Sequence, residues 1–388
     1  MKYKLMILIF FLCVFLMYIC CIDNIQNTIV LMKNEKMNIR TLYGMKIEDE
    51  EYIKTSSSGS VYKKVKVKAF NVPVKEISVK TLPEIEVVPL GNLVGLKIYT
   101  KGVLVVGVED RSNNIQIKEG DTIISINEKN VESIGDVKKI LKKSQGKNLK
   151  IKYLNSSKNK IMTSNIFPTK NENDEFELGL WIKEGASGVG SMSFYIPDTM
   201  EFAALGHGIY DKDTDTLLII EKGEVVTSKV LKISKADRMT PGEIRGSIEK
   251  GKDIGKIKSN SEFGIYGTIN NLKNLGLKSK RTIKVASRNE IVEGDAYIYC
   301  SLDGKNVEEY KIKINDIDIN NDINNRSMKI EVTDEKLLDK TGGIICGMSG
   351  SPIIQNGKLI GVVTNVLVNN SKIGYAVFAD IMIKEMIN

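Results

Sequence analysis

The residues best suited to do chemistry are a serine and the glycines around it, in the stretch 341–354. Ser349 lies between Gly347 and Gly350, and an apolar strand pattern with an Asn-Gly turn follows it. Flanking glycines allow the backbone to turn tightly, so that the hydroxyl projects while nearby amides converge on one point. A serine presented in this way is a candidate nucleophile. Ser351 is the competing serine, and its alternative role is to form the turn.

A serine hydroxyl is a weak nucleophile without a base, and the chain contains a single histidine. This residue, His207, is flanked by glycines and precedes Ser349 in the chain. The third member of a triad is an acid that fixes the imidazole tautomer. Asp334 would give the order His, Asp, Ser, and three further acids follow the histidine closely: Asp211, Asp213 and Asp215. The residues alone leave the choice of acid open.

The glycine-framed turn around Ser349 resembles the nucleophile loop of chymotrypsin-like serine peptidases, because it enters an apolar strand and a hairpin. By that resemblance the amides of Gly347 and Ser349 form the oxyanion hole. This pair would hold the negative oxygen of the tetrahedral intermediate.

Composition excludes several other chemistries. The chain has 388 residues, 42% of them hydrophobic and 27% charged, which is enough for two folded domains. No cysteine and histidine cluster has zinc-ligand spacing, so neither a metal nor a cofactor is expected. The net charge of +8 is spread along the chain among acids, which argues against a nucleic-acid partner. Whether Cys300 and Cys346 pair is left open.

The N-terminus has a pattern that is typical of a targeting signal. Lys2 and Lys4 precede an uninterrupted apolar run at 5–22, and the first acid is Asp23. At about 1.5 Å per residue this run just spans a hydrocarbon core of roughly 30 Å. We therefore expect a transmembrane signal anchor at 1–23, with the rest of the chain exported. A cleaved signal peptide is the alternative.

Residues 24–86 are rich in lysine, with short alternating patterns at 65–68 and 72–75. This composition predicts a solvated spacer with some short strands. An acidic stretch at 170–175 marks a second boundary. The region after it, 176–388, has many short strands and glycines, which predicts a mainly β domain.

Residues 87–167 form a third region, with strand patterns, a helix expected at 134–141 and a last strand at 149–153. The motif Gly-Asp-x-Ile-x-x-Ile-Asn before the helix resembles the central signature of PDZ domains. That resemblance implies a small α+β module that binds an extended peptide as an added strand. The residues expected to contact the peptide are Val94, Gly95, Leu96 and, on the helix, Val137.

Four segments of the last region look together like the stage IV sporulation protein B (SpoIVB) peptidase family: 206–209, 334–338, 341–344 and 347–352. The resemblance implies a chymotrypsin-like β-barrel domain and a triad of His207, Asp334 and Ser349. One departure is Asn365, where the family pattern has a histidine after the threonine.

The same resemblance implies a membrane-tethered signalling endopeptidase of sporulation, located at the forespore membrane and facing the intermembrane space. Its substrate would be the extracytoplasmic part of a membrane-bound regulator, whose cleavage lets an intramembrane protease activate the late mother-cell sigma factor. Self-cleavage in the N-terminal segment is also implied. The alternatives are a general extracytoplasmic quality-control protease with a PDZ domain, and an inactive PDZ scaffold.

Overall fold

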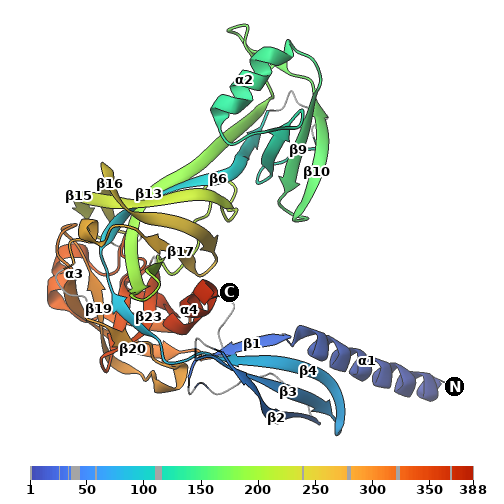
Figure 1. Ribbon diagram of the computed structural model, residues 1–388, viewed down its shortest axis with the longest axis vertical. Helices are drawn as coiled ribbons and strands as arrows, with labels where there is room; N and C mark the ends of the chain where they lie inside the picture. The colour runs from blue at the N-terminus through green and yellow to red at the C-terminus, as the bar shows by residue number, and fades with distance from the viewer. Residues whose placement is uncertain are drawn as a thin grey trace. The chain divides into compact units, whose positions relative to one another are not determined.

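The computed structural model describes residues 2–25, 27–33, 35, 44–56, 59–109, 116–237, 240–277, 281–319, 324–367 and 369–387. Strands make up most of the ordered elements (Figure 1), so the expected mainly β class is confirmed. The chain divides into two compact units. One comprises residues 1–86 and 284–292, and the other comprises 87–283 and 293–388.

The first unit begins with α1 (Lys2–Asn24), which takes up the apolar run. Among the helices of the described residues, none is long and apolar enough to cross a membrane. The anchor expected at 1–23 is therefore not supported.

A four-stranded sheet follows in the same unit, with strand order β1-β4-β3-β2. Its strands are β1 (Thr28–Leu31), β2 (Met45–Thr55), β3 (Val61–Ala69) and β4 (Val72–Thr81). Alternate residues of β3 and β4 point to one face, where Val65, Val67, Ile77 and Val79 are fully buried. The lysine-rich region thus contains a sheet with its own apolar core. Two short elements lie near residue 285: β18 (Ile283–Lys284) and η2 (Arg288–Glu290).

Six strands of the second unit form a closed ring, which we call the first barrel. In order of pairing they are β6 (Leu93–Val108), β15 (Ile220–Ser234), β16 (Glu243–Ser261), β17 (Gly264–Ile269), β14 (Glu201–Ala204) and β13 (Leu180–Ile196), and β13 pairs back to β6. Val94, Leu96, Val225 and Phe202 belong to its buried core. The short elements β5 (Glu86–Pro89) and η1 (Leu272–Leu275) lie beside this core.

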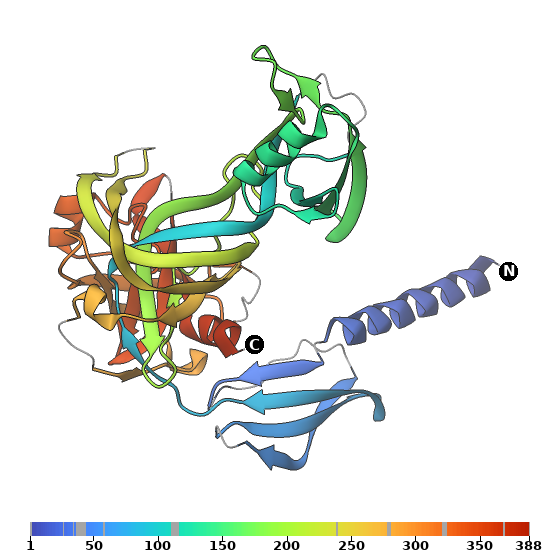
Figure 2. The ribbon, with the colours of Figure 1, turned by 45° about the horizontal axis from the view of Figure 1, so that its top comes forward.

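The two long strands β6 and β13 continue beyond the first barrel (Figure 2). Residues 94–100 of β6 pair with β15, whereas Val103 and Leu104 pair with the next strand, β7. Residues 180–183 of β13 pair with the same outer part of β6. A small module is therefore inserted between two strands of the first barrel.

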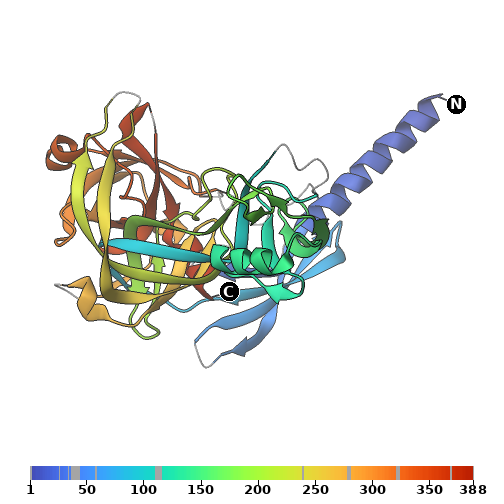
Figure 3. The same cartoon turned by 90° about the horizontal axis from the view of Figure 1, so that it is seen from above.

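The inserted module has its own core, separate from that of the barrel. It comprises β7 (Thr122–Ile126), β8 (Lys129–Asn130), α2 (Ile134–Ser144), β9 (Leu149–Asn155), β10 (Lys160–Ile166), β11 (Thr169–Lys170) and β12 (Phe176–Glu177). The helix is capped by the Ser133 side chain and packs on the strands through Val137 and Leu141. Figure 3 shows the ribbon of this module, in green and teal, with its single helix. The helix expected at 134–141 and the strand expected at 149–153 are confirmed.

The second barrel is closed by six strands in the order β19-β20-β21-β24-β23-β22. These are β19 (Gly294–Cys300), β20 (Glu308–Ile317), β21 (Met328–Val332), β24 (Asn370–Phe378), β23 (Lys358–Leu367) and β22 (Pro352–Gln355). Two helices accompany them, α3 (Glu335–Thr341) and α4 (Ala379–Ile387). Cys300 is buried, Cys346 is exposed, and the two are not paired.

Candidate active site

The turn that carries Ser349 lies between α3 and β22 and packs against β13 of the first barrel. Gly347 and Gly350 have φ values of +101° and +98°, which side chains rarely allow. A Cβ atom on Gly350 would lie 2.0 Å from the carbonyl oxygen of Ser191, so no larger residue fits there. Both glycines are needed for the close packing of this turn.

Three amides in the turn have backbone acceptors within it or beside it. Met348 donates to Ile345, Ser351 donates to Met348, and Gly350 donates to Val363. In the described part of the chain, the amides of Gly347 and Ser349 have no acceptor. These two donors are therefore available to a ligand oxygen.

The loop that carries His207 follows β14 directly. Leu205 and Gly206 have positive φ values of 69° and 70°, so the chain turns sharply just before the histidine. The imidazole is partly buried, and its Nδ1 atom lies 2.9 Å from the carbonyl oxygen of Gly208. Burial lowers the pKa of His207, although the Gly208 carbonyl partly opposes this effect. The imidazole is consequently neutral at pH 7.

Ser191 of β13 connects the serine turn with the histidine loop. Its amide donates to the carbonyl of Ser349 (3.0 Å), and its own carbonyl accepts from the amide of Leu205 (3.2 Å). Its hydroxyl donates to the carbonyl of Gly347 (2.9 Å). Ser191 is buried, so these bonds are shielded from water. One residue thus holds both loops against each other.

The Ser349 hydroxyl donates to the carbonyl of Thr364 (2.7 Å), not to the imidazole. Thr364 is fixed in turn, because its hydroxyl donates to the carbonyls of Asn325 and Tyr375. A Cβ atom on Gly206 would lie 3.0 Å from the Thr364 methyl group. The residue that accepts the hydrogen bond of the Ser349 hydroxyl therefore also lies next to the histidine loop.

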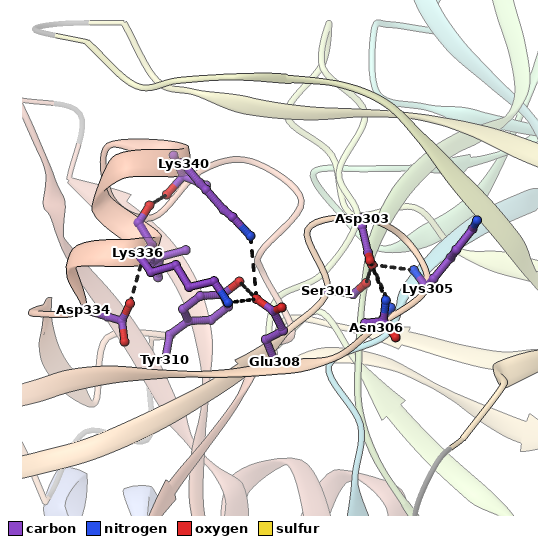
Figure 4. Close-up of polar contacts among 11 residues, drawn as sticks. Ser301, Asp303, Lys305, Asn306, Glu308, Tyr310, Asp334, Lys336 and Lys340 are labelled. Carbon is purple, nitrogen blue, oxygen red and sulfur yellow. Dashed lines mark hydrogen bonds and ion pairs between the residues drawn. The ribbon is translucent and has the colours of Figure 1, made fainter.

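Asp334 lies at the first turn of α3 and acts as its N-cap (Figure 4). One carboxylate oxygen accepts from the amide of Leu337 (3.0 Å), and the other accepts from the amide of Lys311 (3.2 Å). Glu308 lies close by and binds both Tyr310 and the lysines of α3. The structure does not bring Asp334 into contact with His207.

The acids that follow the histidine are engaged elsewhere. Asp211 accepts from Lys183 (3.0 Å) and from the amides of Asp213 and Thr214, and Lys183 also binds Asp213. Ser351, the competing serine, is fully buried, and its hydroxyl has no hydrogen-bond partner among the described residues. Within the described residues, no group of His, Cys, Asp and Glu could hold a metal ion.

The residues expected to bind a peptide do not all lie in the inserted module. Val94 and Leu96 are 1% and 2% exposed in the core of the first barrel, and Gly95 packs there against Ile248. Val137 is buried in the core of the inserted module instead. The first three residues therefore do not line a groove with Val137, because the inner half of β6 belongs to the barrel.

Sequence reasoning missed Ser191 and the acceptor role of Thr364. A serine on a strand has no local signature, and only the three-dimensional pairing brings Ser191 to the serine turn. In the sequence, Thr364 is marked only as the neighbour of Asn365, which departs from the family pattern. Its carbonyl, which no side-chain pattern can report, makes the contact with Ser349.

The model of a family described as SpoIVB peptidase S55 matches residues 174–383. No curated protein matches the chain.

Several solved structures are similar to parts of the chain, and three of them are described here. The PDZ domain of the SdrC-like protein from Listeria monocytogenes is 22% identical, covers 21% of this chain and 87% of its own, and has a TM-score of 0.20. The Rv3671c protease in its inactive form is 14% identical, with coverages of 50% and 81% and a TM-score of 0.30. The active form of this protease from M. tuberculosis is 12% identical, with coverages of 64% and 82% and a TM-score of 0.27.

Proposed function

The chain belongs to the SpoIVB peptidase S55 family and is a serine peptidase, and we propose that Ser349 is its nucleophile and His207 its general base. The observation that carries this proposal is the double contact of Ser191. Its backbone binds the serine turn on one side and the histidine loop on the other. Two loops that are far apart in sequence are thereby held as one site.

The reaction follows from the groups present. The Ser349 hydroxyl turns from the Thr364 carbonyl toward the neutral imidazole, which removes its proton while the oxygen attacks the peptide carbonyl carbon. The imidazolium then gives this proton to the leaving amine as the carbon–nitrogen bond breaks. Water repeats the sequence on the acyl-enzyme and releases the second product.

The oxyanion of each tetrahedral intermediate needs donors that are already in place. The amides of Gly347 and Ser349 have no acceptor in the described protein, and the hydroxyl of Ser191 donates to the carbonyl of Gly347. We assign the oxyanion hole to this pair. A single donor of this kind contributes about 2.7–4 kcal/mol to transition-state stabilisation.

Family resemblance adds Asp334 as the third member of the triad. That role stays a prediction, because both oxygens of Asp334 accept backbone hydrogen bonds at the start of α3.

The biological role in the proposal is signalling in sporulation. The substrate would be the extracytoplasmic part of a membrane-bound regulator, and its cleavage would free an intramembrane protease to activate the late mother-cell sigma factor. The support for this role is membership of the family. A location of the protein outside the cytoplasm is supported by its N-terminal sequence, in which Lys2 and Lys4 precede the apolar run of α1. Side chains of this helix, such as Phe15 and Met6, are largely exposed.

The signalling role is tested by comparing two kinds of substrate. The full chain is incubated with denatured casein and, separately, with extracytoplasmic domains of membrane proteins made by the same cell. A dedicated signalling enzyme cleaves one such domain at a single position and leaves casein largely intact. Rapid, non-specific digestion of casein would favour a quality-control protease instead. Mass spectrometry of the enzyme in the same samples detects self-cleavage near its N-terminus.

A further inference from the structure

We propose that the backbone amide of Ile244, in the first barrel, orients the peptide that supplies the Gly347 donor of the oxyanion hole. Ile244 is thus a positioning residue for the reaction, because it acts through Gly347 and not on the substrate. The inference rests on the proposed function, since it concerns the same oxyanion hole.

The start of β16 runs beside the segment that precedes Ser349. Glu243 and Cys346 form a parallel bridge between the two segments. The amide of Cys346 donates to the carbonyl of Gly242 (2.9 Å), and the amide of Ile244 donates to the carbonyl of Cys346 (2.8 Å). A strand of the first barrel therefore holds the backbone that leads into the serine turn of the second barrel.

The bond from Ile244 sets the direction of the Gly347 N–H. In a planar trans peptide, the carbonyl of one residue and the N–H of the next point in opposite directions. The peptide between Cys346 and Gly347 is trans, and its carbonyl points to the Ile244 amide. Its N–H therefore points away from β16. This N–H is one of the two in the turn that find no acceptor among the described residues.

The peptide before Gly347 needs such a bond because glycine allows it to flip. A flip of this peptide changes the ψ angle of Cys346 and the φ angle of Gly347. Gly347 has a φ value of +101°, and glycine populates positive and negative φ about equally well. The flipped peptide would turn its N–H toward β16 and lose the bond to Ile244. The external hydrogen bond thus selects the orientation that leaves the N–H free for an oxyanion.

Packing keeps β16 and the turn at a fixed separation. Ile244 is 4% exposed, so its hydrogen bond is shielded from water. A Cβ atom on Gly347 would lie 3.1 Å from the Cβ atom of Ile244, which means that the turn lies directly on this side chain. A Cβ atom on Gly242 would lie 2.5 Å from a methyl group of Ile345. Only glycine at position 242 allows this close approach.

The second oxyanion donor is oriented within the turn itself. The carbonyl of Met348 accepts from the amide of Ser351 (3.0 Å), so the N–H of Ser349 points the other way. The two donors are therefore held by different parts of the molecule. The first barrel carries His207 and also orients the Gly347 donor. The nucleophile turn consequently depends on the first barrel for more than its base.

The test removes the N–H of Ile244 and keeps its side chain. In the full-length protein, Ile244 is replaced by its α-hydroxy acid, which converts the peptide bond before it into an ester. The matched control places the same hydroxy acid at Ile344, whose buried amide donates to the carbonyl of Ser371 (2.7 Å). Both esters remove one buried hydrogen bond near the turn, but only the first bond orients an oxyanion donor.

Gly242→Ala is a second perturbation that retains every N–H group. Its Cβ atom would push β16 away from the turn. Reactivity is measured as the rate at which a fluorophosphonate probe labels Ser349, because the phosphoryl oxygen of the probe needs the oxyanion hole. Several probe concentrations separate the limiting rate, kinact, from the half-saturating concentration, KI. Melting temperatures report the stability of each protein.

We expect kinact to fall by about 10- to 10²-fold in the Ile244 ester and in Gly242→Ala, approaching the loss of one oxyanion donor, and to stay within about threefold of wild type in the Ile344 ester. KI should not change, and the two esters should lower the melting temperature similarly. If the Ile244 ester does not fold, the rate of Gly242→Ala decides in the same way.

Equal falls in the two esters, an effect confined to KI, or a wild-type rate in the Ile244 ester would overturn the inference. Any of these results would leave Ser349 and His207 in their proposed roles. Label on a residue other than Ser349 in the wild-type protein would refute the proposed function instead.

Discussion

The hydroxyl of Ser349 donates a 2.7 Å hydrogen bond to the backbone carbonyl of Thr364. The nucleophile is thus held beside the histidine loop with its proton directed to a neutral acceptor. In the proposed mechanism, a rotation of the Ser349 side chain directs this proton to the imidazole instead. The resting enzyme is therefore assembled, but its nucleophile is not yet paired with the base.

Replacing Ser349 by alanine should abolish peptidase activity, with a fall in kcat of about 10⁶-fold. The variant should still fold, because it loses a single hydrogen bond, a cost of about 1 kcal/mol. Self-cleavage of the full chain and urea unfolding measure the two effects.

Ser351→Ala is the matched control. Its hydroxyl is buried and finds no partner in the described part of the chain, so its removal should leave activity unchanged and the free energy of unfolding equal or up to about 1 kcal/mol higher. Loss of activity in the Ser351 variant, with activity kept in the Ser349 variant, would reverse the assignment of the nucleophile.

Ser191→Ala should weaken both stability and catalysis. The change leaves the Gly347 carbonyl without its buried donor, which costs about 1–3 kcal/mol. It also frees the peptide next to the oxyanion hole, so we expect kcat to fall by up to about 10²-fold, the effect of losing one oxyanion donor.

Ser193→Ala, two residues further along β13, provides the comparison. This hydroxyl is fully buried and has no hydrogen-bond partner within the residues that the structure describes, so its loss should change neither stability nor kcat appreciably. Equal losses in kcat for both variants would show that β13 acts only through general packing.

The pH dependence of the enzyme should follow His207. Burial lowers the pKa of this imidazole from its ordinary value of 6.5, so kcat/KM should stay constant down to that pH and fall only at more acidic values. The unfolded chain binds a proton at higher pH than the folded chain does. Stability should therefore rise with pH across the window between the two pKa values, and the His207→Gln variant should lose this slope.

A second titration should appear at acidic pH, in the β19–β20 turn. Partial burial raises the pKa of Asp303, but hydrogen bonds from the amides of Asn306 and Lys305 and from the Asn306 and Ser301 side chains outweigh it and lower this pKa to about 2 (Figure 4). The stabilisation is present above the unfolded value near 3.8 and is lost as pH falls through about 2.

Asp303→Asn should be less stable than wild type at neutral pH, with a smaller loss of stability on acidification from pH 4 to pH 2. Urea unfolding at a series of pH values measures this slope. The same slope in wild type and variant would mean that other carboxylates dominate acid unfolding.

Local patterns were sufficient to predict several elements. The periodicity of 134–141 predicted α2, and the glycines around Ser349 predicted a tight turn that the positive φ values of Gly347 and Gly350 confirm. These features depend on residues that are close in sequence. Local physics therefore determines them.

Features that depend on long-range pairing could not be predicted. The strand β6 is continuous, so nothing in its sequence shows that residues 94–100 belong to a barrel and the remainder to an inserted module. The helix α3 and the N-cap role of Asp334 were not predicted either, although an aspartate just before a helix is typical of an N-cap.

The central claim is that Ser349 is a nucleophile activated by His207. Labelling the full-length protein with a fluorophosphonate probe, and mapping the modified residue by mass spectrometry, tests it most directly. The account predicts a single label on Ser349 that disappears in His207→Ala and persists in Ser351→Ala. Label on another residue, or undiminished labelling of Ser349 without the histidine, would contradict it.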